Sequence, residues 1–288
     1  MPGSDVAGVR LLLDGLRFAE APRWHRGRLW FSDIFAQRVL TVDELGQVDT
    51  VMAFTGDELP CGLGFLPGGV PLVVDMQRPV LLRLDADGPR VHADLTALAV
   101  GGLNDMVVAS DGRAYVGSMG TPGSRAVPAD GRIILVEPDG SARVVADGLE
   151  APNGPVLTPD GRSYVVAEFP AGRLTAFDRE ADGSLSGRRL WADLRPGSAD
   201  GIAVDAEGAI WTASPRENEC RRVVEGGEVT DVVRVDDRMP LACALGGTDG
   251  HTLFVLSAVG GEERIRLRTN TSVIETTRVR VPAPARRR

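Results

Sequence analysis

The sequence predicts an all-β fold, a six-bladed β-propeller with four-stranded antiparallel blades around a central channel. Three observations predict it: turn glycines recur every 42 to 49 residues, a β-rich run follows each of them, and helical periodicity is nearly absent. Four short strands in a unit of this length are typical of a propeller blade.

The repeat is defined by six glycines, each placed in a hairpin turn between two short apolar runs. These are Gly27, Gly69, Gly112, Gly161, Gly208 and Gly250. Most units then offer a second hairpin, as in residues 132–145, where Glu137-Pro138-Asp139-Gly140 makes the turn. Six such units account for the chain, so we expect six blades.

We expect one propeller domain over residues 10–282. The apolar segment 9–13 precedes the first hairpin and is predicted to add a strand to the last blade, which closes the ring and removes exposed sheet edges. The remaining residues, 283–288, form a basic tail that we expect to be disordered.

Composition excludes several classes of function. The net charge of −8 would repel nucleic acid, and no window of eighteen apolar residues could span a membrane. The N-terminus lacks the pattern of a secretory signal, so we expect a cytoplasmic protein with a small-molecule substrate. All 32 basic residues are arginine, which excludes Schiff-base chemistry on a lysine. Three widely spaced cysteines do not indicate a disulfide framework.

Polar residues recur at one position of the repeat, eight residues before the turn glycine. In a propeller the first strand of each blade lines the channel, so equivalent positions form a ring around the axis. The turn of the first blade is one residue shorter, which brings a glutamate into this register. The predicted ring residues are Glu20, Cys61, Asn104, Asn153, Asp200 and Ala242.

Three of these residues, Glu20, Asn153 and Asp200, carry the oxygen ligands that Ca²⁺, Mg²⁺ or Mn²⁺ prefers. Two carboxylates that converge in a channel repel each other unless a cation lies between them. The alternative is that these side chains only bind turn backbone at the channel mouth. The residues alone leave both interpretations open.

Four motifs occur in a characteristic order: Glu20-Ala21-Pro22-Arg23-Trp24, Asn104-Asp105, Pro152-Asn153-Gly154, and Asp200-Gly201-Ile202. In this respect the chain resembles the SMP-30/gluconolactonase/luciferin-regenerating-enzyme family over roughly residues 15–282. The resemblance implies a six-bladed propeller with one divalent cation in its channel, Ca²⁺ first and Zn²⁺, Mn²⁺ or Mg²⁺ as alternatives. It implies Glu20, Asn153 and Asp200 as ligands, Asp200 as general base, and Asn104 as a contact to substrate or water.

The chain departs from the sugar lactonases of that family where substrate would bind. The arginine expected two residues before Asn104 is Gly102, and the glycine expected after Asn-Asp is Met106. Cys61 and Ala242 are small and poorly suited to bind a polyol. We therefore expect Asn104, Gly102, Met106 and Cys61 to line a substrate site that is roomier and less polar than a sugar lactone needs.

These observations predict a metal-dependent hydrolase of the lactonase type, in which Asp200 takes a proton from the attacking water. Fold and metal do not fix the reaction, and three alternatives stand beside it. They are a tailoring enzyme of secondary metabolism (a cyclase or isomerase), a phosphotriesterase-like hydrolase, and a non-catalytic binding propeller, which the intact set of metal ligands disfavours.

Overall fold

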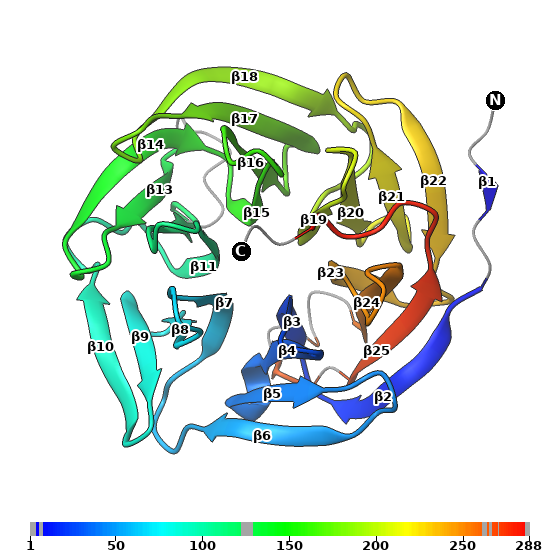
Figure 1. Ribbon diagram of the computed structural model, residues 1–288, viewed down its shortest axis with the longest axis horizontal. Coiled ribbons are helices and arrows are strands. Elements are labelled where there is room, and N and C mark those ends of the chain that lie inside the picture. The colour runs from blue at the N-terminus through cyan, green and yellow to red at the C-terminus, as the bar shows by residue number, and fades with distance from the viewer. Residues whose placement is uncertain are drawn as a thin grey trace.

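Six antiparallel sheets stand in a ring around a common axis, as Figure 1 shows for the computed structural model. The structure describes residues 4–5, 8–121, 129–260, 264, 267–269 and 271–285. Within this part of the chain the predicted six-bladed propeller is confirmed. Of the predicted basic tail, residues 283–285 have no regular secondary structure, and residues 286–288 lie outside the described residues.

Each of the first five blades is a run of four consecutive strands, the first innermost and the last at the rim (Figure 1). Blades 1 to 3 are built from β3 (Ala19–His25), β4 (Arg28–Asp33), β5 (Arg38–Val42), β6 (Val48–Ala53), β7 (Pro60–Phe65), β8 (Pro71–Asp75), β9 (Val80–Asp85), β10 (Gly88–Asp94), β11 (Leu103–Val108), β12 (Ala114–Ser118), β13 (Gly131–Val136) and β14 (Ala142–Leu149). A short 3-10 helix, η1 (Ile34–Ala36), joins β4 to β5.

Blade 4 is built from β15 (Pro152–Leu157), β16 (Ser163–Glu168), β17 (Arg173–Arg179) and β18 (Leu185–Asp193). Blade 5 is built from β19 (Ile202–Val204), β20 (Ile210–Ser214), β21 (Glu219–Val223) and β22 (Val229–Arg234). Three strands of blade 6 follow, β23 (Met239–Gly246), β24 (Thr252–Val259) and β25 (Thr271–Arg278). A two-residue strand, β1 (Ser4–Asp5), pairs in parallel with the outer strand of blade 5.

The last blade is completed from the other end of the chain. β2 (Arg10–Leu16) pairs antiparallel with β25, with Leu11 opposite Glu275. This confirms the closing strand predicted for residues 9–13. This pairing joins the N-terminal and C-terminal parts of the chain within blade 6 through backbone hydrogen bonds, which closes the ring.

All six predicted turn glycines lie between the first and second strands of a blade, with φ between +72° and +89°. The first turn is the shortest, as predicted: His25 pairs with Arg28, and only Arg26 and Gly27 lie between them. Both have positive φ, as a two-residue type I′ turn requires. The repeat read from these glycines is therefore the blade repeat.

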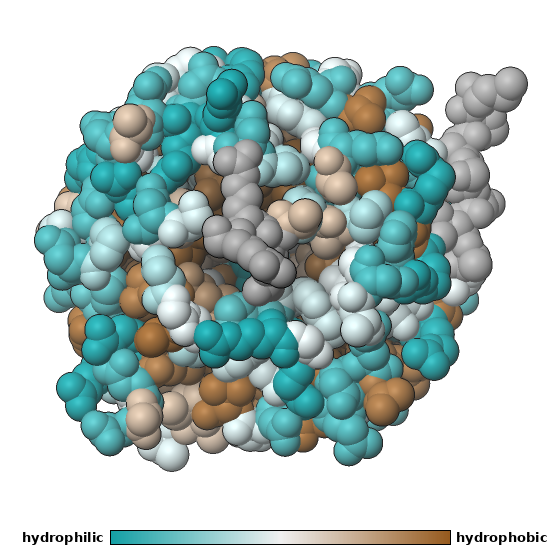
Figure 2. Space-filling model, in the orientation of Figure 1, coloured by the Kyte–Doolittle hydropathy of each residue, from teal (hydrophilic) through white to brown (hydrophobic). Residues whose placement is uncertain are grey.

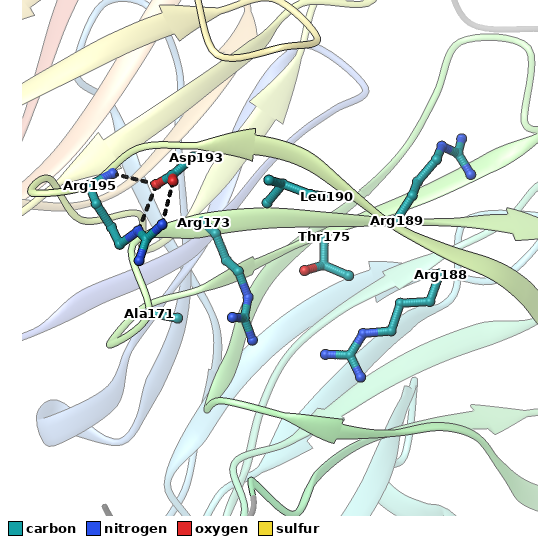
Figure 3. Close-up of a pocket in the computed structure, with 8 residues that line it drawn as sticks. All are labelled: Ala171, Arg173, Thr175, Arg188, Arg189, Leu190, Asp193 and Arg195. Atoms are coloured by element: carbon teal, nitrogen blue, oxygen red, sulfur yellow. Dashed lines mark hydrogen bonds and ion pairs between the residues drawn. The ribbon is translucent and has the colours of Figure 1, made fainter.

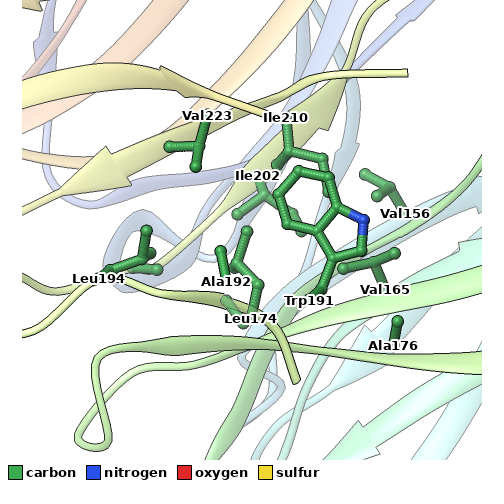
Figure 4. Packing of buried hydrophobic residues seen from close by; sticks show 12 residues of the cluster. Val156, Val165, Leu174, Ala176, Trp191, Ala192, Leu194, Ile202, Ile210 and Val223 are labelled. Carbon is green, nitrogen blue, oxygen red and sulfur yellow. The ribbon is translucent and has the colours of Figure 1, made fainter. Parts of the chain in front are cut away.

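Hydrophobic clusters fill the spaces between neighbouring blades. Figure 4 shows one of them, in which Trp191 of β18 packs against Ile202 and Ile210 of blade 5 and Val156 and Val165 of blade 4. Trp211 lies in the equivalent cluster between blades 5 and 6. Trp191 and Trp211 therefore stabilise the contacts between neighbouring blades.

Replacing Trp191 with alanine should lower the free energy of unfolding by about 3–5 kcal/mol, because it removes a large ring from a closed interface. Trp191 is 5% exposed, whereas its neighbour Leu190 on the same strand is 60% exposed. Chemical denaturation would measure both changes, with Leu190→Ala as the matched control. A similar loss for the two variants would contradict the packing role of Trp191.

Hydrophobic residues on the face seen in Figure 2 appear as small separate patches between hydrophilic ones. In the described part of the chain, no helix has the length and apolar character needed to cross a membrane.

Candidate functional site

The innermost strands of the six blades form a closed ring of contacts. Each of β3, β7, β11, β15, β19 and β23 touches the next, and β23 touches β3 (Figure 1). The predicted ring residues lie on these strands, or two residues before one in the case of Asp200. The structure thus places all six positions on, or two residues before, the inner strands of the ring.

The pairing between the first and second strands is irregular near four of these positions. The register between first and second strands shifts after Glu20 in blade 1, around Cys61 in blade 2, at Asn104 in blade 3 and at Asn153 in blade 4. A bulge bends its strand and turns a side chain away from the regular alternation, and bulges are common beside active sites. Here they free the ring residues from the ladder.

Glu20 is partly buried, and its Oε2 accepts a hydrogen bond of 3.0 Å from the Ala21 amide. Burial raises the pKa of Glu20 to about 8, and the charge of Asp105 adds to the rise, while Arg23 opposes it. A counter-charge would be needed to hold this carboxylate ionised near pH 7.

Asp200 is 9% exposed, and its backbone N–H donates to Ala213 O at 2.9 Å. Burial, with Glu20 and Asp105 nearby, raises the pKa of Asp200 well above its usual range. Its Oδ1 is buried without a hydrogen-bond partner among the described residues. Buried oxygens are almost always paired, so this one is suited to a ligand.

The donor set fits a hard divalent cation. Besides the unpaired oxygen of Asp200 and the carboxylate of Glu20, Asn153 offers an amide that makes no side-chain hydrogen bond within the described residues. In that part of the chain no three His, Cys, Asp or Glu side chains form a metal-binding group by themselves. A cation here would therefore need the amide oxygen as well as the two carboxylates.

Asn104 and Cys61 meet in the channel wall. The Cys61 thiol donates to Asn104 Oδ1 at 3.3 Å, which leaves the amide nitrogen of Asn104 as a donor. Burial raises the pKa of the thiol, and the charges of Glu20, Asp105 and Asp200 raise it further. Cys61 is thus a neutral group that orients Asn104.

The two remaining predicted substrate residues differ from each other. Gly102 is partly exposed, and a Cβ placed there would meet only Met76 O, at 3.7 Å. Met106 is 0% exposed and packs in the cluster between blades 2 and 3, so its side chain does not reach the channel. The substrate contact predicted for Met106 stays a prediction.

The profile described as the SMP-30/Gluconolactonase/LRE-like region matches residues 18–259. The chain belongs to this family. The resemblance inferred from the four motifs is confirmed, and the ring of Glu20, Asn104, Asn153 and Asp200 lies within the matched region.

Two lactonases are among the proteins that this chain resembles. It is 28% identical over 248 residues to 6-deoxy-6-sulfogluconolactonase of Pseudomonas putida, covering 83% of this chain and 82% of that protein. It is 29% identical over 262 residues to pentonolactonase XacC of Haloferax volcanii, covering 88% and 85%. The structure superposes on that of regucalcin, a calcium-binding protein from Agrobacterium tumefaciens, with a TM-score of 0.75, 22% identity and 98% of each chain covered.

Two charged residues beside the ring, Asp105 and Arg23, were not predicted from the sequence. Asp105 is buried beside the ring, and Arg23 forms an ion pair with it at 2.8 Å. Both residues stand inside the quoted motifs, next to Asn104 and three residues after Glu20. Their position in the motifs was the available signal.

Three buried carboxylates that were also not predicted hold the chain segments that precede Glu20, Cys61 and Asn153. Asp33 accepts from Phe18 N at 2.9 Å, Asp75 from Leu59 N at 3.1 Å, and Glu168 from Glu150 N at 2.7 Å. Each carboxylate closes the second strand of its blade and pairs with an arginine. They fix the backbone two or three residues before Glu20, Cys61 and Asn153.

A groove of about 480 Å³ lies away from the channel, on β17, β18 and the segments beside them (Figure 3). Arg195 is paired with Asp193, Arg173 with Glu168, and Arg188 with backbone carbonyls of blade 3. These arginines already have acceptors, so the groove does not present a free cationic site. It is lined by Ala171, Arg173, Thr175, Arg188, Arg189, Leu190, Asp193 and Arg195.

Proposed function

We propose that this chain is a lactonase-type hydrolase that uses one divalent cation, Ca²⁺ first, to open a cyclic ester with water. The observation that carries the proposal is Asp200, a buried carboxylate whose Oδ1 has no hydrogen-bond partner among the described residues. The places of Glu20 and Asn153 on the inner strands of blades 1 and 4 support it. The two lactonase relatives, each matched over more than four fifths of its length, support the reaction type.

Glu20, Asn153 and Asp200 would hold the cation through two carboxylates and one amide oxygen. When bound, a divalent cation supplies positive charge that polarises the lactone carbonyl and favours the ionised form of Asp200. Three protein ligands leave room for substrate and water.

The side chains of this protein divide the remaining work. Asp200 accepts a proton from the water that attacks the carbonyl carbon, and returns it to the ring oxygen when the carbon–oxygen bond breaks. The amide nitrogen of Asn104, held by Cys61, donates a hydrogen bond to the substrate. The product is the open hydroxy acid.

A turnover screen tests this proposal. The protein loaded with Ca²⁺ should hydrolyse aliphatic lactones or aldonolactones, measured by acid release at constant pH. Hydrolysis of a phosphotriester alone would favour the phosphotriesterase-like alternative. If no lactone or phosphotriester is turned over while Ca²⁺ binds, a carbonyl cyclase or isomerase becomes the better proposal, which the absent arginine at Gly102 would fit.

Gly102→Arg should raise kcat/KM on sugar lactones by about ten- to a hundredfold, since a charge-assisted hydrogen bond to a substrate hydroxyl is worth about 1.5–3 kcal/mol. The backbone there leaves room for a Cβ, as its contact of 3.7 Å to Met76 O is an ordinary one. Gly102→Met is the matched control, because it adds similar length without charge. Equal gains for the two variants would show that bulk, not the guanidinium, is responsible.

A further inference from the structure

Arg23 links blade 1 to blade 3. It lies on β3, and its Nη2 donates both to Asp105 Oδ1, at 2.8 Å, and to the carbonyl of Met106 on β11. Its Nη1 donates to Pro22 O at 2.8 Å. The guanidinium is therefore fixed at three points and reaches past the inner strand of blade 2.

Blade 2 makes this approach possible because its inner strand carries glycines where it meets β11. A Cβ at Gly62 would lie 2.7 Å from Asn104 O and 2.9 Å from Met106 N, and one at Gly64 would lie 2.4 Å from Val108 Cγ2. At Gly62 the backbone of β7 thus lies directly against the backbone of β11, and at Gly64 it lies against the side chains of Val108 and Met106.

Asp105 adds a third carboxylate to the two proposed as ligands. Glu20, Asp105 and Asp200 are here called the channel carboxylates. The charge of Asp105 raises the pKa of both Glu20 and Asp200, and Arg23, which pairs with Asp105 at 2.8 Å, lowers that of Glu20. With all three ionised, as they would be around a bound cation, three carboxylates and one guanidinium give a formal charge of −2. Without Arg23 the sum would be −3, and a divalent cation would not neutralise it.

We propose that Arg23 is a positioning residue that, through its ion pair with Asp105, sets the channel charge to −2 and so makes the site select a divalent over a trivalent cation. This inference rests on the proposed function, because it needs a cation at Glu20, Asn153 and Asp200. Arg23 itself would not touch the cation, because a guanidinium is positively charged and has no acceptor atom, and its Nη groups are held by Asp105, Met106 and Pro22.

The test compares Ca²⁺ with Tb³⁺, which is of similar size and carries one more charge. Dissociation constants would be measured by calorimetry for Ca²⁺ and by luminescence for Tb³⁺, neither of which depends on activity. Arg23→Met should shift the preference roughly tenfold or more towards Tb³⁺, because one positive charge is lost near the site. Asp105→Asn should shift it in the other direction, and the double variant should return close to the wild-type ratio.

Arg83→Met is the matched control: Arg83 forms an ion pair of the same length, 2.8 Å, with Asp85 on β9, two strands outward from the inner strand of blade 2, and should leave the ratio unchanged. If Arg23 only held the strands together, Arg23→Met would weaken both cations equally, and an unchanged ratio would overturn the inference alone. Should Arg23→Met not fold, Asp105→Asn and the double variant decide in the same way. A wild type that binds neither cation would overturn both this inference and the proposed metal site.

Discussion

Asp200→Asn is expected to lower kcat for lactone hydrolysis by about 10²–10⁴-fold, the usual contribution of a positioned general base. An amide has almost the same shape and still offers an oxygen, so Ca²⁺ binding should weaken without being abolished. It cannot take the proton of the attacking water at neutral pH. Kinetics and calorimetry on the same preparation would separate the two effects.

Asp193→Asn is the control for this substitution, because it makes the same chemical change on a carboxylate that pairs with Arg195 at the surface. We expect wild-type turnover from it. Undiminished hydrolysis by Asp200→Asn would remove Asp200 from the mechanism. Complete loss of Ca²⁺ binding would mean that its carboxylate is essential as a ligand, and the loss of turnover would then not establish its role as the base.

The sequence was sufficient to predict what repeats. Turn glycines such as Gly27 occupy positions where the backbone needs a positive φ, which is a local requirement that the sequence shows directly. The number of blades follows from the spacing of these glycines. The closing strand followed from one unpaired apolar segment, residues 9–13. The ring followed because equivalent positions of a symmetric fold must face the same axis.

The packing of Met106 between blades has a physical cause in the pairing of β11 with β12. Leu103 pairs with Ser118, but Met106 pairs with Val116, so three steps on one strand match two on the other. The extra residue reverses the alternation of side chains, and Met106 turns into the space between blades. Counting residues along a strand cannot reveal a bulge.

The ion pair of Arg23 with Asp105 could not be predicted for a different reason. The two residues are 82 positions apart, on blades that are not neighbours, and neither occupies the ring register. Their meeting depends on how closely β7 approaches β11, which the absence of a side chain at Gly62 allows. The carboxylates that close the second strands did leave a signal: Asp33 and Asp75 each lie six residues after their turn glycine.

Removing the cation with a chelator is expected to abolish hydrolysis and to lower the melting temperature by about 5–10 °C. A cation that binds only the folded state, present at a hundred times its dissociation constant, stabilises that state by about 2.7 kcal/mol. For a chain of this size each kcal/mol shifts the midpoint by about 2–4 °C. Glu20 and Asp200 would in addition be left close together without a counter-charge, which disfavours the folded state further.

The double variant Glu20→Gln/Asp200→Asn separates this effect from a general action of the chelator. It lacks both charged ligands, so its melting temperature should change little when Ca²⁺ is withdrawn. Calorimetric melting of wild type and double variant, with Ca²⁺ and with chelator, gives four temperatures. Withdrawal of Ca²⁺ should lower the melting temperature of the wild type and leave that of the double variant unchanged. The metal-free wild type should melt below the metal-free double variant, because the amides remove the repulsion between Glu20 and Asp200. A wild type that melts at the same temperature in both conditions would mean that the oxygen of Asp200 without a partner serves something other than a cation.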